Sequence, residues 1–506
     1  MNKNPTFTDN RKDDCERNVG FFMEKNRPEK ISKNLEENMK ICEQMLAISK
    51  SFDLLERKMT VGGRACCFYF VDGFTKDEAM LKIMDSLYGI AEADMPATAR
   101  QLVEDHLPYV EVELLARYED LGKNLFAGVL CLFVDGYDCC IAIDCRTYPA
   151  RGVEEPQKDK VLRGSRDGFV ETLIFNTALI RRRIRDADFR VEIQNVGRAS
   201  KTDVVLCYMD GRVDQQLLGE IRKRLQTVDV DALTMNQESL AECLYKRRWY
   251  NPFPKFKYTE RPDTVSACIL EGNIVVLVDN SPSAMVIPTS IFDIVEEADD
   301  YYFPPITGTY LRLSRFLIAI VTLIITPLFL LMMQNPEVVP DWLSFVMVKE
   351  ELHVGLLWQF LILELAVDGL KLAALNTPSV LTTPLSIIAA LVLGEFSVKS
   401  GWFNSEVLVY MAFVALANYT QASLELGYAL KFMRIMLLFT TRLFDVWGFV
   451  GGLIVVILFI CFNKTVAGKS YIYPLIPFDP KECARRFLRV RVPHTYEEKK
   501  GEGGGK

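Results

Sequence analysis

The sequence predicts an α+β multidomain membrane protein, in which two related cytoplasmic α/β subdomains precede an α-helical transmembrane domain. Three observations predict this class. Charged residues are dense in the first 300 residues and sparse in the next 150. The charged part contains the same order of strand, turn and helix patterns twice. The later part contains apolar runs long enough, or nearly so, to cross a hydrocarbon core of about 30 Å as helices.

Six parts follow one another along the chain. Segment 1–50 is polar and includes an amphipathic helix. It lacks the apolar core of a cleavable signal peptide, so we expect the N-terminal body to stay in the cytoplasm. The other parts are subdomain 1 (51–150), a linker with a connecting helix (151–200), subdomain 2 (201–310), the transmembrane domain (311–465) and a basic cytoplasmic tail (466–506).

The two subdomains are predicted from matching local patterns. The first copy has a β-rich stretch at 65–71, a turn at Asp72-Gly73 and helical spacing at 76–87; the second has them at 203–209, Asp210-Gly211 and 215–225. A hairpin pattern follows each copy, at 125–145 and 272–288. A duplicated fold explains this recurrence, but such pieces are common, so chance recurrence is the alternative.

Three uncharged runs define the transmembrane domain: 316–333, 407–424 and 446–462, with eighteen, eighteen and seventeen residues. Stretch 372–394 is also uncharged but contains two prolines, whereas 352–374 contains Glu364, Asp368 and Lys371. We therefore expect about four crossings, with 353–374 as a re-entrant or interfacial helix.

A six-crossing arrangement is the alternative. It would carry 430–444 through the bilayer together with Lys431, Arg434 and Arg442, which is costly for three cations. We expect this segment to be a membrane-surface helix on the inner face instead.

Cationic residues flank the apolar runs and predict the topology. Arg312 and Arg315 precede the first run, and a basic stretch follows the last one. By the positive-inside rule both chain ends lie in the cytoplasm, which requires an even number of crossings. Six arginines are expected to mark the topology and contact lipid headgroups: Arg312, Arg315, Arg434, Arg442, Arg485 and Arg486.

Ionisable residues within the apolar region are the candidates for an ion path. Glu364, Asp368 and Lys371 are spaced i, i+4 and i+7, which places them on one face of a helix. The alternative is an interfacial helix with a wet polar face, in which Asp368 and Lys371 pair. Glu395 is a further candidate, and its alternative role is to mark a helix end at the headgroups.

Small residues four positions apart occur twice in the apolar region, at Ala390 and Gly394 and at Gly448 and Gly452. Such pairs allow helices to approach closely and make self-association plausible.

The sequence gives no sign of catalysis. The chain has thirteen cysteines without a CxxC or Cys/His ligand spacing and three histidines, so we expect no metal site. It also lacks a nucleophile elbow, an HExxH motif and a dinucleotide fingerprint, so we expect no catalytic residue and no cofactor. A long basic stripe with interleaved aromatic residues is missing too, so nucleic acid is not an expected partner.

Several stretches, in this order, resemble the GerA family of spore germination proteins, the A subunits. They are RGVEEPQKDKVLRGSRDGF (151–169), NTALIRRRIRD (176–186), GRASKTD (197–203), WYNPFPKFKYTERPD (249–263), LEGNIVVLVD (270–279), GTYLRLSRF (308–316) and YPL (473–475) followed by Pro477. The resemblance covers about residues 50 to 490. Segments 51–78 and 164–186 look most like a branch of the family outside the nutrient-receptor operons.

The resemblance implies a multi-pass protein of the inner spore membrane that forms an oligomeric ring around an ion-conducting pore. Family A subunits are thought to work with a transporter-like B subunit and a lipoprotein, and the branch is thought to amplify germination by ion release with a small membrane partner. Asp368-Gly369-Leu370-Lys371 replaces the family's usual Glu-Ala pair, which puts the pore character of this segment in question. A non-conducting scaffold for germination receptors and a secondary transporter are the alternatives.

Overall fold

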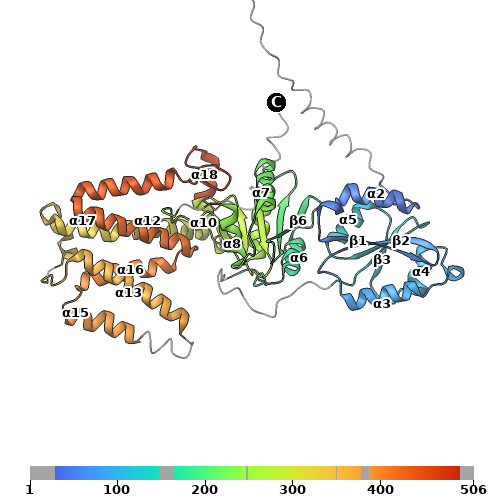
Figure 1. The fold of residues 1–506 in the computed structure, drawn as a ribbon, viewed down its shortest axis with the longest axis horizontal. Coiled ribbons are helices and arrows are strands. Elements are labelled where there is room, and N and C mark those ends of the chain that lie inside the picture. The colour runs from blue at the N-terminus through green and yellow to red at the C-terminus, as the bar shows by residue number, and fades with distance from the viewer. Residues whose placement is uncertain are drawn as a thin grey trace, which may run out of the picture.

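A computed structural model describes residues 29–489 apart from 147–160, 162, 247–248, 349 and 378–386. The described chain forms three bodies in a row, two α/β domains and one helical body (Figure 1). The expectation of two α/β units followed by a helical region is therefore confirmed.

The first α/β domain is a five-stranded antiparallel sheet with helices on both faces. Its strand order is β1-β2-β4-β5-β3, with β1 (Leu54–Val61), β2 (Arg64–Val71), β3 (Val112–Leu115), β4 (Leu130–Val134) and β5 (Cys140–Ile143). Successive side chains of β2 point to opposite faces. Cys67 and Tyr69 pack in the core with α2 (Leu35–Leu46) and α5 (Tyr118–Phe126). Cys66 and Phe68 pack in the core with α3 (Asp77–Tyr88) and α4 (Ala99–His106).

The second α/β domain repeats this arrangement. Its strand order is β6-β7-β9-β10-β8, with β6 (Phe189–Val196), β7 (Thr202–Met209), β8 (Lys257–Thr259), β9 (Ile274–Val278) and β10 (Ala284–Ile287). α6 (Leu173–Arg183) and α9 (Pro262–Leu270) cover one face, and α7 (Gln215–Thr227) and α8 (Asn236–Leu244) cover the other. Every strand and covering helix has a counterpart in the first domain, so the recurring sequence pattern corresponds to a duplicated fold.

A buried arginine joins the two domains. Arg181 of α6 donates from Nε to Asp53 Oδ2 at 2.9 Å and from Nη2 to Asp53 Oδ1 at 3.2 Å. Asp53 directly precedes β1, and a third donor of Arg181, Nη1, reaches the carbonyl of Phe189 in β6 at 3.1 Å. The arginine therefore links the first strand of each sheet.

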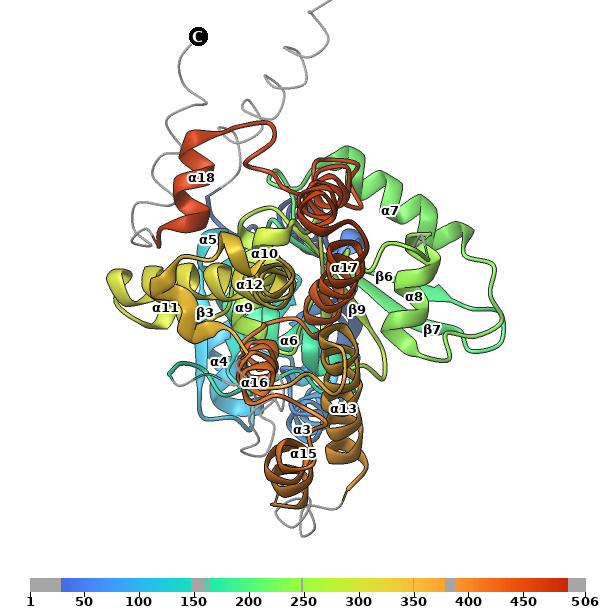
Figure 2. The same cartoon turned by 90° about the vertical axis from the view of Figure 1, so that its left-hand side faces the viewer.

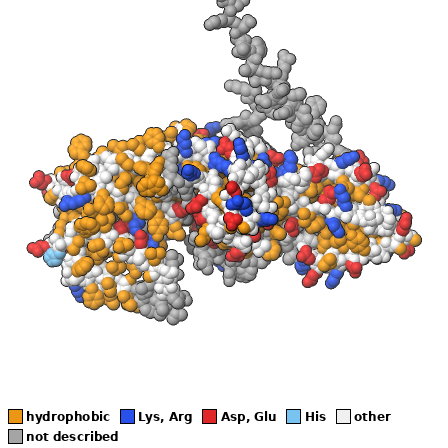
Figure 3. Space-filling view, in the orientation of Figure 1, with side chains coloured by type: hydrophobic (Ala, Val, Ile, Leu, Met, Phe, Trp, Pro, Cys, Tyr) orange, Lys and Arg blue, Asp and Glu red, His pale blue; other side chains and the backbone are white. Residues whose placement is uncertain are grey.

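The helical body follows two short connecting helices, α10 (Ile291–Val295) and α11 (Asp299–Tyr302). Its described helices are α12 (Pro305–Gln334), α13 (Leu356–Asn376), a π-helical stretch (Ala390–Phe396) continued by α15 (Ser397–Lys399), α16 (Ser405–Tyr419) and α17 (Leu424–Cys461). Figure 2 looks along these helices, and Figure 3 shows that hydrophobic side chains dominate the face of this body that is turned to the viewer. Among the described residues, α12 and α17 are long and apolar enough to cross a membrane.

α17 reverses direction at Asp445, where φ is 54° and ψ is −131°. We call 424–444 its first arm and 446–461 its second arm. Gly448 and Gly452 of the second arm face Thr440 of the first, and a Cβ atom on Gly448 would lie 1.9 Å from Thr440 O. The two arms therefore form a tightly packed antiparallel hairpin, whereas we expected 430–444 to be a membrane-surface helix.

Side-chain contacts show which helix ends lie together. At the far end, Asn335 after α12 donates to Asp445 at 2.6 Å, and Gln359 near the start of α13 donates to Asn404 before α16 at 2.8 Å. At the near end, beside the second α/β domain, residues 421–425 face Lys257. Consecutive helices of the body therefore run alternately away from and toward the α/β domains.

Candidate functional site

The candidate functional site is a cluster of four charged side chains inside the helical body. Arg434 of the first arm of α17 donates from Nε to Glu364 Oε1 of α13 at 2.8 Å. Its Nη1 donates to the carbonyl of Thr322 in α12 at 3.3 Å, so this arginine of α17 contacts two other helices. The side chain of Arg434 is fully buried, and that of Glu364 is 4% exposed.

Lys431, one turn before Arg434, completes the cluster. Its Nζ donates to the Asp368 carboxylate and to the Glu364 carbonyl, the latter at 3.2 Å, and lies 3.5 Å from Glu364 Oε2. Two carboxylates and two cations thus balance one another. A buried charge is tolerated in an apolar body when it is paired and hydrogen-bonded in this way, which explains how the first arm holds two cations.

The three residues predicted on one face of α13 have different surroundings. Glu364 and Asp368 both pair with the first arm of α17, whereas Lys371 lies over the rings of Tyr419 and Tyr428 at 5.5 and 5.7 Å. The partner of Asp368 is Lys431 rather than Lys371. Lys431 was missed as a site residue. The signal that could have found it is that Lys431 and Arg434 lie about one helical turn apart, as do Glu364 and Asp368.

The other predicted residues lie away from this cluster. Glu395 pairs with Lys399 on the same exposed face, with side chains 54% and 67% exposed. Gly394 has open space beside it, and Ala390 lies in the same π-helical stretch. Gly448 and Gly452 pack within their own chain, as described above.

A second charged cluster lies where the α/β part meets α12. Arg315 donates to both oxygens of Asp300, at 2.8 and 3.0 Å, and Arg312 donates to Glu296 at 2.8 Å. Arg486 of α18 (Pro480–Phe487) also donates to Glu296, at 3.3 Å. Burial alone would raise the pKa of the Glu296 carboxyl, but the charges of Arg312, Arg486 and Lys257 and a hydrogen bond from Tyr301 together hold this pKa below its ordinary value.

These contacts differ from the expected headgroup contacts of the arginines. Arg312 and Arg315 are buried against acidic side chains, and Arg312 also donates to the carbonyls of Arg485 and Arg486 at 3.2 and 3.1 Å. Arg434 is buried in the first cluster. Arg442 is exposed near the far end. The difference arises because acidic side chains cover these arginines. Glu296 and Asp300, 12 to 16 residues away, cover Arg312 and Arg315, and Glu364, seventy residues away, covers Arg434.

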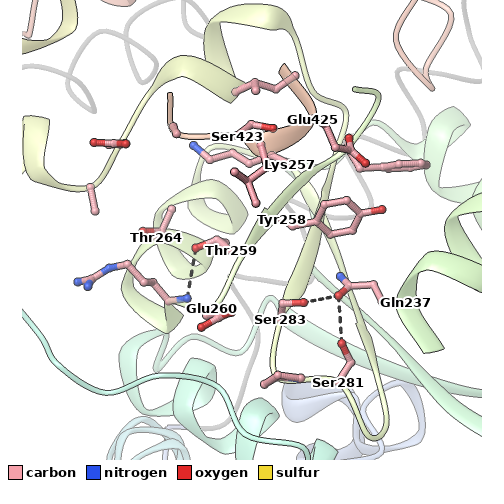
Figure 4. Close-up of a pocket in the computed structure, with 18 of the residues that line it drawn as sticks. Gln237, Lys257, Tyr258, Thr259, Glu260, Thr264, Ser281, Ser283, Ser423 and Glu425 are labelled. Carbon is pink, nitrogen blue, oxygen red and sulfur yellow. Dashed lines mark hydrogen bonds between the residues drawn. The ribbon is translucent and has the colours of Figure 1, made fainter. Parts of the chain in front are cut away.

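A pocket of about 830 Å³ lies between the second α/β domain and the start of α17 (Figure 4). Gln237 bridges Ser281 and Ser283 on one side, and Ser423 and Glu425 lie across from them. Within the described part of the chain, no group of three His, Cys, Asp or Glu side chains is arranged to hold a metal ion.

Comparisons with known proteins agree with the sequence resemblance. Residues 42–500 match the family model "Bacillus/Clostridium GerA spore germination protein". The chain is 33% identical to stage V sporulation protein AF of Bacillus subtilis (strain 168) over 465 residues, which cover 92% of this chain and 94% of that protein. It is 26% identical to spore germination protein KA of the same organism, with 96% and 89% covered.

A solved structure is also similar, the N-terminal domain of the A subunit of the Bacillus megaterium spore germinant receptor GerK3. It matches with a TM-score of 0.39 and 25% identity, over 51% of this chain and 97% of that one. The family model extends over both α/β domains, the helical body and α18. This chain therefore belongs to the GerA family of spore germination proteins.

Proposed function

We propose that the protein is a subunit of an oligomeric ion channel in the inner spore membrane, where it releases ions and amplifies germination. The family and the relatives support the germination role. The closed charge cluster of Glu364, Asp368, Lys431 and Arg434 carries the membrane part of the proposal. Such a neutral, hydrogen-bonded cluster allows charged helices to lie inside a bilayer.

The proposed topology has six crossings and both chain ends in the cytoplasm. They are α12, α13, the helix ending at Lys399, α16 and the two arms of α17. The cost of the cations in 430–444 favoured four crossings from sequence alone. Pairing of Lys431 and Arg434 with acids of α13 lowers that cost, and the alternating helix directions favour the higher even number.

The proposed ion path lies between copies of the chain. Glu364 is enclosed by its partners, so it is not available to line a water-filled path. Asp368, at the edge of the cluster, is 26% exposed and Glu395 is 54% exposed, and most other exposed side chains of their helices are apolar. Exposed ionisable groups of this kind are expensive in lipid, so water between neighbouring copies is the environment that suits them. Open space beside Gly369 and Gly394 leaves room for a second copy.

Ion flux through the purified full-length protein in liposomes tests this proposal. Glu395→Gln removes the exposed carboxylate and should lower cation flux severalfold, since a charge lining a path concentrates the permeating ion. Glu337→Gln, in the exposed loop after α12, is the matched control and should conduct like the wild type. Equal flux through Glu395→Gln and the wild type contradicts the proposed path.

A non-conducting scaffold is the second candidate. The complete pairing of Glu364 and Arg434 favours it, because a charge cluster can serve helix packing alone. In that case the protein would hold other germination membrane proteins, such as a transporter-like B subunit or a small membrane partner, through its α/β domains. Liposomes with oligomeric wild-type protein would then show no flux above that of empty liposomes.

A further inference from the structure

Two exposed aromatic residues of the second α/β domain lie near the end of α17: Tyr250 packs against the helix, and Trp249 packs against Tyr250. Trp249 is 96% exposed, and its ring centroid lies 6.1 Å from that of Tyr250. The Tyr250 ring lies 6.4 Å from Phe459, two residues before α17 ends at Cys461. The three rings therefore form a chain from the α/β domain to the near end of the helical body.

Polar contacts fix this aromatic pair to the end of α17. Asn251 donates from Nδ2 to Asn463 Oδ1 at 3.0 Å, and Lys255 donates from Nζ to the Lys464 carbonyl at 2.5 Å. Lys255 is 5% exposed and lies between two tyrosine rings, at 5.3 and 5.4 Å. Segment 249–255 is thus fixed beside the C-terminal end of α17.

The exposed apolar surface of the helical body also extends to this end of α17. The second arm of α17 exposes Ile457 and Leu458 up to its last turn, and Phe462 beyond it is 80% exposed. On the neighbouring α12, Tyr310, Leu313 and Leu317 are exposed over the first turns. An exposed apolar surface therefore reaches the level of Trp249 and Tyr250 without a break along α17.

We propose that Trp249, Tyr250 and Phe462 form an interfacial collar that lies in the headgroup region of the leaflet next to the α/β domains. Tryptophan and tyrosine favour this region because they have an apolar ring and a polar N–H or O–H group. The bilayer is the occupant that the geometry favours, because the collar is continuous with the lipid-facing side of α17. The proposal requires a helical body embedded in a bilayer and is independent of ion conduction.

The second α/β domain is linked covalently to α12, and the collar adds a direct contact between this domain and the bilayer. Because Lys255 and Asn251 bind the residues that follow α17, a tilt of this domain against the membrane would pull on the second arm. The collar therefore holds the domain at a fixed orientation to the helices.

Fluorescence of a single-tryptophan variant tests the collar. The chain has five tryptophans, and Trp342, Trp358, Trp402 and Trp447 are replaced by phenylalanine so that only Trp249 emits. The full-length variant is placed in vesicles of phospholipids brominated either near the headgroup end or near the tip of the acyl chain. The control also carries Trp249→Phe and, as its only tryptophan, Tyr88→Trp on exposed α3 of the first domain.

We expect headgroup-end bromines to lower Trp249 emission by about half, chain-tip bromines to lower it less, and aqueous iodide to have little effect. The control should respond to iodide alone. Strong iodide quenching of Trp249 without an effect of bromines would overturn the proposal, and so would insensitivity to both quenchers, which indicates cover by a protein. An intact collar in a protein without ion flux would leave this inference standing and reject the channel.

Discussion

Arg434 of α17 donates a 2.8 Å hydrogen bond from Nε to Glu364 of α13, and the two side chains are buried seventy positions apart in sequence. The same guanidinium donates to the Thr322 carbonyl, so one side chain holds three helices of the body together. Neither charge is tolerable in this environment without the other.

Removal of one partner is therefore expected to be far more damaging than removal of both. Arg434→Met or Glu364→Gln alone should lower the free energy of unfolding by roughly 3–5 kcal/mol, because the remaining group loses its main partner in an apolar body. The double variant Glu364→Leu with Arg434→Met should recover most of this loss. Thermal unfolding of the purified proteins in detergent compares the stability of the three variants with that of the wild type. Additive losses in the double variant would contradict the pairing.

The hairpin of α17 makes a second prediction about stability. A Cβ atom on Gly448 would lie 1.9 Å from Thr440 O, so Gly448→Ala must push the two arms apart. Gly451 lies in the same arm with nothing within 4 Å of its Cβ position, so Gly451→Ala should be neutral or stabilising by up to about 1 kcal/mol. The melting temperature in detergent should fall for Gly448→Ala alone. Equal effects of the two substitutions would show that the arms are not packed as described.

Local sequence patterns predicted the elements well where each element carries its own signal. The stretch 65–71, the Asp72-Gly73 turn and the helix 76–87 correspond to β2, a turn with Gly73 at φ 77° and α3. The recurrence of this pattern also anticipated the duplicated sheet. These features succeed because strand alternation, turn glycines and helical spacing are set within ten or so residues.

The charge clusters were not predictable in the same way. Glu364 and Asp368 were recognised as unusual, but their partners lie in a helix that was expected on the membrane surface. That helix reverses direction at Asp445, where the sequence has neither proline nor glycine, so no local sequence signal predicted the hairpin. Burial of Arg312 likewise depends on Glu296 and on α18, which begins 168 residues after it.

The cluster around Glu296 predicts that acid loosens the junction of α12 and α18. The pKa of this carboxyl is lower in the folded protein than in the unfolded chain, so its stabilising contribution is complete at neutral pH. The contribution is lost as pH falls from the unfolded pKa through the lower folded pKa. The protection factors of the α18 amides, which are exchange rates corrected for the intrinsic pH dependence of amide exchange, should therefore fall over this acidic range in the wild type. In Glu296→Gln the α18 amides should have low protection factors already at neutral pH, whereas in the exposed control Glu220→Gln they should follow the wild type.

Arg181 makes a prediction about the two α/β domains. Arg181→Lys keeps the charge but loses the two-pronged contact with Asp53 and the stacking on Phe189, whose ring centroid lies 4.3 Å from the guanidinium carbon. The backbone N–H of Phe52 donates to the Val191 carbonyl of the second domain at 3.0 Å. Its hydrogen exchange should become at least tenfold faster, which corresponds to a loss of about 1.4 kcal/mol in the free energy of local opening. Arg182→Lys, one residue along on the exposed side of α6, should leave it unchanged. Equal exchange rates at Phe52 in the two variants would show that contacts other than the Arg181–Asp53 pair hold the two α/β domains together.

The six-crossing topology predicts the sides of two neighbouring turns, and four crossings predict the opposite. Gly401 lies against His353 at the far end of the helical body, whereas residues 421–425 lie beside Lys257 of the second α/β domain. With six crossings a cysteine at Ser400 is therefore outside the cell and one at Thr420 inside. If 372–394 and 407–424 both crossed and 353–374 did not, these sides would be exchanged.

Labelling with a membrane-impermeant maleimide on sealed, right-side-out vesicles distinguishes the two topologies. Ser400→Cys and Thr420→Cys are exposed positions, and they are introduced after serine has replaced the native cysteines that react. Glu337→Cys after α12 is the outside control, and Lys469→Cys after α17 is the inside control. We expect Ser400→Cys and Glu337→Cys to react in intact vesicles, and Thr420→Cys and Lys469→Cys only after permeabilisation. Reaction of Thr420→Cys but not Ser400→Cys in intact vesicles would exclude six crossings and require the first arm of α17 to lie outside the bilayer, where Lys431 and Arg434 would need no buried acids.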